Sequence, residues 1–170
     1  MIEYRDATPA DAVPLDAMAV ASWMPTFGWS YEADDLNAYL AEAYGPTGEL
    51  TRHLADPAHR FRVATEGETI VGYAKLSPIW LPGIDPACAA QLSQLYVAYS
   101  HHGTGIAGVL FDWTVENARA GGATALYLTV WENNPRAKRF YEKAGFVHVG
   151  DYDFPVGKKI DRDLIMRLEL

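Results

Sequence analysis

The chain has 170 residues, of which 49% are apolar and 21% charged, and its formal net charge is −8. This composition is typical of a folded globular protein, and the length predicts one domain over residues 1–170. An acidic chain with only 14 lysines and arginines is not expected to bind nucleic acid.

Neither a membrane segment nor a metal site is expected. No apolar run approaches the roughly 20 residues that span a bilayer, and the N-terminus lacks a basic-then-apolar signal, which predicts a cytoplasmic protein. Cys88 is the only cysteine, and the five histidines lack the spacing of metal ligands.

Apolar periodicity and turn residues predict alternating strands and helices. The expected strands are 2–5, 61–65, 70–76, 90–97, 125–131, 146–149 and 164–170. The expected helices run from Pro9 to about 23, from 32 to 44, briefly after Thr47, from 106 to Gly121, and from 135 to 145. This order predicts an α/β protein with one mixed sheet surrounded by helices.

The segment HHGTGIAGVL, residues 101–110, places three glycines in the pattern G-x-G-x-x-G. A dinucleotide-binding fold needs the first glycine directly after the first strand and an acid about 20 residues later, and both are missing. No Gly-Lys-Ser/Thr follows, so the P-loop pattern also fails. What remains is a helix N-terminus whose free amides, from Gly103 to Gly108, suit a pyrophosphate. The alternative is a tight turn in which the glycines serve packing alone.

Two motifs resemble those of the GCN5-related N-acetyltransferases (GNAT). His102-Gly103-Thr104-Gly105-Ile106-Ala107 is similar to the R/Q-x-x-G-x-G/A motif that binds acetyl-CoA, with His102 in place of Arg or Gln. The second motif, N-x-x-A-x-x-x-Y-x-x-x-G-F, is complete in Asn134, Ala137, Tyr141, Gly145 and Phe146. The segments GWSYEADDLNAYLAEAY, VWENNPRAKRFYEKAGF and DRDLIM resemble the PaiA-type polyamine acetyltransferase branch.

The resemblance implies a GNAT fold, with about seven mostly antiparallel strands, and transfer of an acetyl group from acetyl-CoA to a primary amine. Tyr141 is the implied general acid for the leaving thiolate. The positions that the resemblance assigns to acetyl-CoA are Leu95, Tyr96, Val97, His102, Gly103, Thr104, Gly105, Ile106, Ala107, Gly108, Asn134 and Lys143, with Lys138 beside them. His102 either adds charge to the phosphate site or is a solvated loop residue.

Four aromatic residues between the first two helices suggest a wall over the acceptor site. They are Trp23, Phe27, Trp29 and Tyr31, of which Trp29 and Tyr31 are the expected substrate contacts and at least one is expected to be structural. Aromatic faces and nearby acids suit an ammonium group.

The general base is open between a water molecule and an acid among Glu32, Asp34 and Asp35. Direct transfer is favoured over a Cys88 acyl intermediate, because no base is placed beside that thiol. The leading substrate class is a polyamine. Acetylation of a protein N-terminus or lysine, or a non-catalytic CoA-binding regulator, remains an alternative, and exposed edge strands leave a homodimer open.

Overall fold

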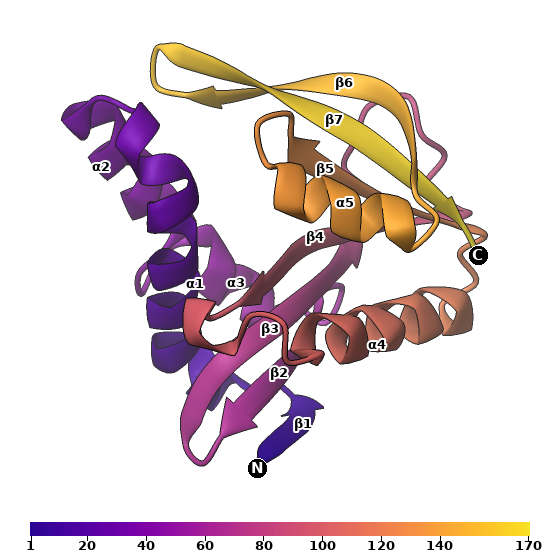
Figure 1. Cartoon of the computed structure of the whole chain (residues 1–170), viewed down its shortest axis with the longest axis horizontal. Helices are drawn as coiled ribbons and strands as arrows, with labels where there is room; N and C mark the ends of the chain where they lie inside the picture. Colours follow the sequence, from indigo (N-terminus) through magenta and orange to yellow (C-terminus); the bar gives the residue numbers. More distant parts are fainter.

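The computed structural model describes residues 1–170 and contains one seven-stranded sheet with helices on both faces (Figure 1). The strand order is β1-β2-β3-β4-β5-β7-β6, and β4 with β5 is the one parallel pair. The strands are β1 (Ile2–Asp6), β2 (Arg60–Glu66), β3 (Thr69–Pro78), β4 (Ala89–Val97), β5 (Ala125–Trp131), β6 (Val147–Val156) and β7 (Lys159–Glu169). The helices are α1 (Ala12–Phe27), α2 (Ala33–Ala43), α3 (Glu49–Ala55), α4 (Ile106–Ala120) and α5 (Pro135–Lys143). The mixed, mostly antiparallel sheet predicted above is confirmed.

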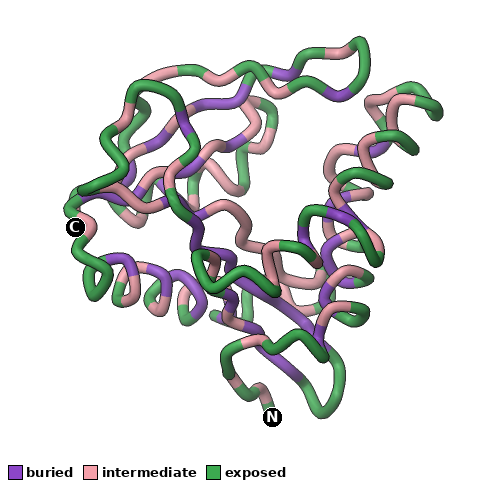
Figure 2. The backbone as a smooth tube through the Cα atoms, turned by 180° about the vertical axis from the view of Figure 1, so that it is seen from behind, coloured by how far each residue is buried: buried purple, intermediate pink, exposed green.

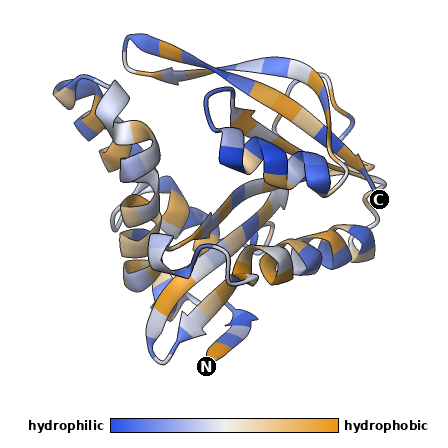
Figure 3. Ribbon diagram, in the orientation of Figure 1, coloured by the Kyte–Doolittle hydropathy of each residue, from blue (hydrophilic) through white to orange (hydrophobic).

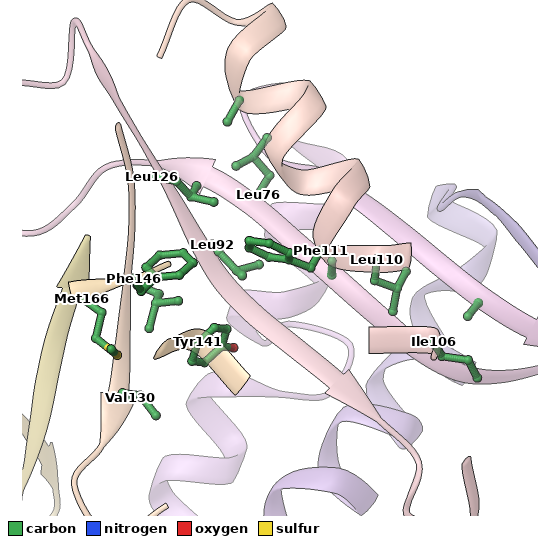
Figure 4. Packing of buried hydrophobic residues seen from close by; sticks show 14 of the residues in the cluster. Leu76, Leu92, Ile106, Leu110, Phe111, Leu126, Val130, Tyr141, Phe146 and Met166 are labelled. Atoms are coloured by element: carbon green, nitrogen blue, oxygen red, sulfur yellow. The ribbon is translucent and has the colours of Figure 1, made fainter. Parts of the chain in front are cut away.

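The two faces of the sheet carry separate cores. Alternation along β3 sends Tyr73 to the face covered by α1, α2 and α3, and Ala74 and Leu76 to the other face. On that other face, α4 and α5 pack their apolar residues against the strands (Figure 4). Figure 2 shows buried residues along the strands and on the helix surfaces that face them. Each face therefore presents its own set of side chains to any opening in the sheet.

Strands β4 and β5 separate soon after they meet. Only Ala89, Ala90 and Gln91 pair with β5, and beyond Gln91 the β5-facing edge of β4 has no neighbouring strand. Ser93 is an extra residue in β4, because Lys75 pairs with Gln94 while the next residue of β3 pairs with Leu92. A bulge of this kind bends the strand, and β4 turns away from β5. The sheet therefore opens between β4 and β5.

The last two strands are much longer than predicted. The sequence indicated strands at 146–149 and 164–170, whereas β6 and β7 have 10 and 11 residues and form a hairpin that turns at Gly157 and Lys158. The charged residues of this stretch resemble a loop in sequence, but pairing between the two strands satisfies their backbone groups. Helix α1 also continues past Pro25 to Phe27 instead of ending near Trp23.

Candidate active site

Six consecutive main-chain amides at the start of α4 have no acceptor within the protein. None of the N–H groups of residues 103–108 donates a backbone hydrogen bond, and the first that does belongs to Val109, which bonds to Gly105. Gly103 and Gly105 have φ of +79° and +89°, and a Cβ on either would have no neighbour within 4 Å. Free amides at a helix N-terminus form an anion site. The loop therefore has both the donors and the open space that a diphosphate needs.

His102 links this loop to α5. Its Nδ1 contacts a guanidinium nitrogen of Arg136, and its Nε2 lies 2.9 Å from the carbonyl oxygen of Val97. A guanidinium can only donate, so Nδ1 accepts and Nε2 carries the proton. Burial of the ring lowers the pKa of His102, and the charge of Arg136 acts in the same direction. His102 is therefore neutral, which is neither of the two roles expected from the sequence, and the positive charge at the loop belongs to Arg136.

The open edge of β4 carries Leu95, Tyr96 and Val97, the three residues expected to face the pantetheine arm. Their other edge pairs with β3, where Tyr96 is opposite Tyr73. On the β5 side these residues have no strand partner, but the carbonyl of Val97 is already occupied by His102. Backbone groups alternate between the two edges of a strand, and the amide of Ala98 bonds to Val71 of β3, so the groups of Tyr96 point towards β3. Leu95 and the amide of Val97 therefore provide the free backbone groups at the opening.

Tyr141 is the one buried residue of α5, a helix that is otherwise largely hydrophilic (Figure 3). Its ring centroid lies 5.4 Å from that of Phe140 and 5.6 Å from that of Phe146. Figure 4 shows its hydroxyl directed away from Val130 and Met166. Burial raises the pKa of Tyr141, with a further contribution from Tyr96 on β4, so the phenol stays protonated at neutral pH.

Asn134 begins α5 as the sequence predicts. Its side-chain oxygen accepts a hydrogen bond from the amide of Ala137 at 3.2 Å, and Pro135 is the first helical residue. The cap fixes the start of the helix that carries both Arg136 and Tyr141. Lys138 donates to the carbonyl of Glu132 at 3.2 Å.

The predicted aromatic wall divides into structural and exposed members. Trp23 is buried, with its ring centroid 5.2 Å from Phe27 and 5.8 Å from Tyr31. Phe27 in turn lies 5.5 Å from Trp131 at the end of β5. Trp29 is 75% exposed, and its indole N–H donates to the carbonyl of Thr26. Trp23 is thus a core residue, Phe27 and Tyr31 are half-buried, and Trp29 is the member that lines the cavity described next.

A cavity of about 740 Å³ lies where the end of α1, the end of β5 and the start of β7 meet. Its lining residues are Thr26, Trp29, Ser30, Trp131, Asn133, Asn134, Lys159 and Asp161. The hydroxyl of Tyr31 donates to the buried carboxylate of Asp161. The ammonium of Lys159 lies 3.0 Å from the same carboxylate and 4.7 Å from the centre of the Tyr31 ring. The cavity wall therefore combines two tryptophans, four uncharged polar side chains and one carboxylate, whose charge the ammonium of Lys159 balances.

Asp161, Asp163 and Arg136 are residues of this site that the sequence analysis did not identify. Both aspartates are buried on β7, and burial raises the pKa of Asp163 to about 6, with the charge of Asp161 acting in the same direction. Their spacing of two residues is the signal that they share one face of a strand. The sequence analysis predicted no strand at 159–163, so the spacing could not be interpreted as two side chains on one face.

The acids considered as bases lie outside the cavity lining. Glu32 and Asp34 are exposed at the start of α2, and Asp35 accepts a hydrogen bond from the amide of Lys158 at the hairpin turn. Cys88 is exposed beside the paired end of β4, where its carbonyl accepts from the amide of Thr124. It is therefore remote from the opening, which argues against an acyl-cysteine.

Lys143 ends α5, seven residues beyond Arg136, so it lies about 10 Å further along the helix from the glycine loop. Its contact with the cofactor stays a prediction. No helix in the fold combines the length and apolar character needed to cross a bilayer.

Comparison with known proteins agrees with this geometry. The Acetyltransferase (GNAT) family matches residues 18–146. An uncharacterized N-acetyltransferase of Mycobacterium tuberculosis is 34% identical over 133 residues, which cover 78% of this chain and 81% of the relative. The N-alpha-acetyltransferase RimI of the same species is 31% identical over 105 residues, covering 62% of this chain and 63% of RimI.

Among solved structures, the PaiA N-acetyltransferase of Thermoplasma acidophilum in complex with coenzyme A superposes with a TM-score of 0.77 and 24% identity, covering 100% of this chain and 99% of that one. An acetyltransferase from Salmonella typhimurium, solved with acetyl-CoA, gives a TM-score of 0.73 and 18% identity, covering 100% and 94%. These two likenesses concern the fold. The family match and the mycobacterial relative go further, and this chain belongs to the GNAT family as an N-acetyltransferase.

Proposed function

We propose that the protein transfers an acetyl group from acetyl-CoA to a primary amine of a small molecule, with polyamines as the leading substrate class, by direct attack in a ternary complex. The observation that carries this proposal is the continuity of three features. Free amides at residues 103–108 are followed by the open edge of β4, and the end of β5 across the opening borders a cavity lined by Trp29, Trp131 and Asp161.

The glycine loop is the part that fits the diphosphate of acetyl-CoA. Its six amides need acceptors, and the guanidinium of Arg136, held by His102, adds a positive charge next to them. The backbone of Leu95 and the amide of Val97 would bind the pantetheine arm at the open strand edge. Asn134, although its oxygen caps α5, keeps its side-chain amide N–H groups for the same arm.

Tyr141 is assigned as the general acid. When the amine attacks the thioester carbonyl, the departing thiolate needs a proton. Burial keeps the phenol of Tyr141 protonated, and its ring is fixed between Phe140 and Phe146. A fixed, protonated phenol whose hydroxyl points away from Val130 and Met166 is suited to that transfer.

The acceptor cavity contains the kinds of contact that a positively charged group makes. Lys159 places its ammonium against the Tyr31 ring and the Asp161 carboxylate, which is the environment that an alkylammonium group prefers. The net charge of −8 also attracts cations at long range. A polyamine offers two or more such groups, one to be held and one to be acetylated.

A second candidate is acetylation of a protein N-terminus. The observation in its favour is the 31% identity with an N-alpha-acetyltransferase. A peptide acceptor would bring an α-amino group and a backbone, whereas the cavity is bounded by two tryptophans and by the Asp161 carboxylate, which suit a single ammonium group. The small-amine reading is therefore preferred, and both classes belong in one substrate panel.

Release of free thiol from acetyl-CoA, measured with polyamines, aminoglycosides, amino acids and a peptide with a free N-terminus, tests the proposal. We expect the highest kcat/KM with a polyamine. Activity confined to the peptide would favour the second candidate. CoA binding by calorimetry without thiol release from any amine would leave a CoA-binding regulator.

Tyr141→Phe tests the acid. We expect kcat to fall by roughly 100-fold or more, because a positioned acid contributes about 10²–10⁴. The Kd for CoA should stay unchanged. Tyr4→Phe, a similar loss of a phenol on the edge strand β1, is the matched control and should leave kcat unaltered. Undiminished thiol release by Tyr141→Phe across the working pH range would overturn the assignment.

A further inference from the structure

Asp163 is a buried carboxylate with no cationic partner. It is 8% exposed and lies in β7, opposite Trp131 of β5 and Tyr152 of β6. Asp161, two residues away, is held by the hydroxyl of Tyr31 and the ammonium of Lys159, whereas none of the ion pairs of the protein includes Asp163. The one side-chain partner of Asp163 is the hydroxyl of Thr129 on β5, which lowers the pKa of Asp163 but brings no positive charge. A buried carboxylate without a cation is costly for the fold, so its presence calls for a role.

The side chain of Asp163 lies on the acceptor face of the sheet. On β5, Leu128 and Val130 face the core beneath α4 and α5, so Trp131 faces the opposite side. Asp163 shares the face of its register partner Trp131, and Asp161 lies about 7 Å along the same face, where it lines the cavity. Asp163 is therefore the acid one pleat deeper than the cavity wall, towards the opening of the sheet.

Charged and titratable groups reach Asp163 from each element around it. Asp161 lies on its own strand, with Lys159 beyond, and Tyr152 is opposite on β6. The charge of Asp163 contributes to raising the pKa of Tyr31 and Tyr39 on the helical side and of Tyr96 on β4.

Tyr96 connects Asp163 with the general acid. It lies on the open edge of β4 and also contributes to raising the pKa of Tyr141. Tyr141 reaches this strand from the α5 side and Asp163 from the side of α1 and α2. The two groups therefore flank the opening from opposite faces, which is the arrangement that a reaction with one proton donor and one proton acceptor requires.

We propose that Asp163 is the general base of the acetyl transfer, an assignment that rests on the proposed amine acetylation. The amine nitrogen forms a bond to the thioester carbonyl carbon and gives one N–H proton to the Asp163 carboxylate. The C–S bond then breaks, and the thiolate takes the phenolic proton of Tyr141. Asp163 returns its proton to solvent and Tyr141 regains one, so both residues end as they began.

The acidity of this carboxyl suits the step. An aspartate with an ordinary pKa is a weak base, whereas the pKa of about 6 caused by burial gives Asp163 more proton affinity while leaving it ionised at neutral pH. The attacking nitrogen becomes acidic only as its bond to carbon forms, so the proton moves when it is needed.

The test compares Asp163→Asn with Asp161→Asn, using the amine that gives the highest wild-type rate. For Asp163→Asn we expect kcat at pH 7.5 to fall by about 100-fold or more, with an unchanged Kd for CoA by calorimetry. The wild-type kcat should decline below about pH 6, and this acid limb should be missing in Asp163→Asn. Asp161→Asn should raise KM for the amine and keep the acid limb. Asp163→Glu should recover part of kcat.

Two results would overturn the inference. One is an Asp163→Asn enzyme that keeps kcat within about threefold and retains the acid limb, which would show that another group accepts the proton. The other is a folded Asp163→Asn variant whose Kd for CoA rises as much as its kcat falls, which would indicate a structural role. Failure of the proposed function has a different signature, because wild-type protein would then bind CoA and release no thiol with any amine.

Discussion

At the scale of single residues, the glycine loop shows how one substitution in a motif is accommodated. His102 occupies a position where the family motif has Arg or Gln, and it cannot supply a charge because Arg136 donates to its Nδ1. The positive charge that the motif places in the loop is supplied here by Arg136 on the neighbouring helix α5. The loop keeps its six free amides and gains a contact that fixes its position relative to α5.

Removing that cation should weaken cofactor binding. For Arg136→Met we expect the Kd for CoA to rise about tenfold at low salt, since charge-assisted contacts to phosphate are worth about 1.5–3 kcal/mol. The dependence of that Kd on ionic strength should also become shallower. Calorimetry at two salt concentrations measures both. An equal loss of affinity in Arg139→Met, a neighbouring cation of α5, would show that only net charge matters.

The backbone of Gly105 gives a second prediction. Alanine at φ of +89° costs roughly 1–2 kcal/mol, and the loop can relieve that strain only by moving its amides. Gly105→Ala should therefore lower stability and also weaken CoA binding by about tenfold. Gly67→Ala, at φ of +60° in the turn between β2 and β3, carries similar strain and equal open space. Gly67→Ala should lower the melting temperature as much as Gly105→Ala does, and it should leave the Kd for CoA unchanged.

At the scale of elements, the β6–β7 hairpin and α2 enclose the acceptor side. The amide of Lys158 donates to Asp35 at 3.0 Å, and the ring of Tyr39 lies 5.9 Å from that of Phe154. Gly157, with φ of +57°, brings the turn so close that a Cβ there would overlap the Asp35 carboxylate. This contact joins segments more than 100 residues apart in the chain.

Gly157→Ala should separate the turn from α2. Because Lys159 and Asp161 follow the turn directly, we expect KM for the amine to rise several-fold, while the Kd for CoA stays the same. Gly157→Ala combined with Asp35→Ala removes the overlap but not the backbone strain, and it should recover part of the affinity. Steady-state kinetics with varied amine measures this. A changed Kd for CoA in either variant would contradict the separation of the two sites.

At the scale of the whole molecule, the buried acid of β7 should affect stability in the direction opposite to its effect on activity. The folded pKa of Asp163 is raised to about 6, above its ordinary value near 4. The folded state therefore binds more protons than the unfolded state between these values, and this group lowers the free energy of unfolding as the pH rises through that range.

Asp163→Asn should accordingly be more stable than the wild type at pH 7.5, by at most about 3 kcal/mol, because two pKa units correspond to that free energy. At pH 3.5, where the wild-type carboxyl is neutral, the difference should vanish. Thermal or urea denaturation at both pH values measures it. A variant that is less stable than the wild type at pH 7.5 would show that the carboxylate is stabilising.

Much of the fold and the cofactor side of the site could be predicted from the sequence. Local signals mark them: Asn134 and Pro135 start α5, and the glycines between 103 and 108 mark a turn before a helix. The acceptor side could not be predicted in the same way. Asp161 and Asp163 acquire their common face only through pairing with β5 and β6, and Arg136 meets His102 only when α5 packs beside the loop. These contacts depend on long-range pairing, which a local pattern does not encode.

The short seam between β4 and β5 has a mechanical consequence. Only three residue pairs join the first four strands of the sheet to its last three. The two halves can therefore move relative to each other about this short connection. A molecule bound in the gap would contact both halves and restrict their relative motion. Amide hydrogens of both halves should then exchange more slowly with deuterium when coenzyme A is added. This slowing should extend to β6 and β7, which lie beyond the reach of the cofactor.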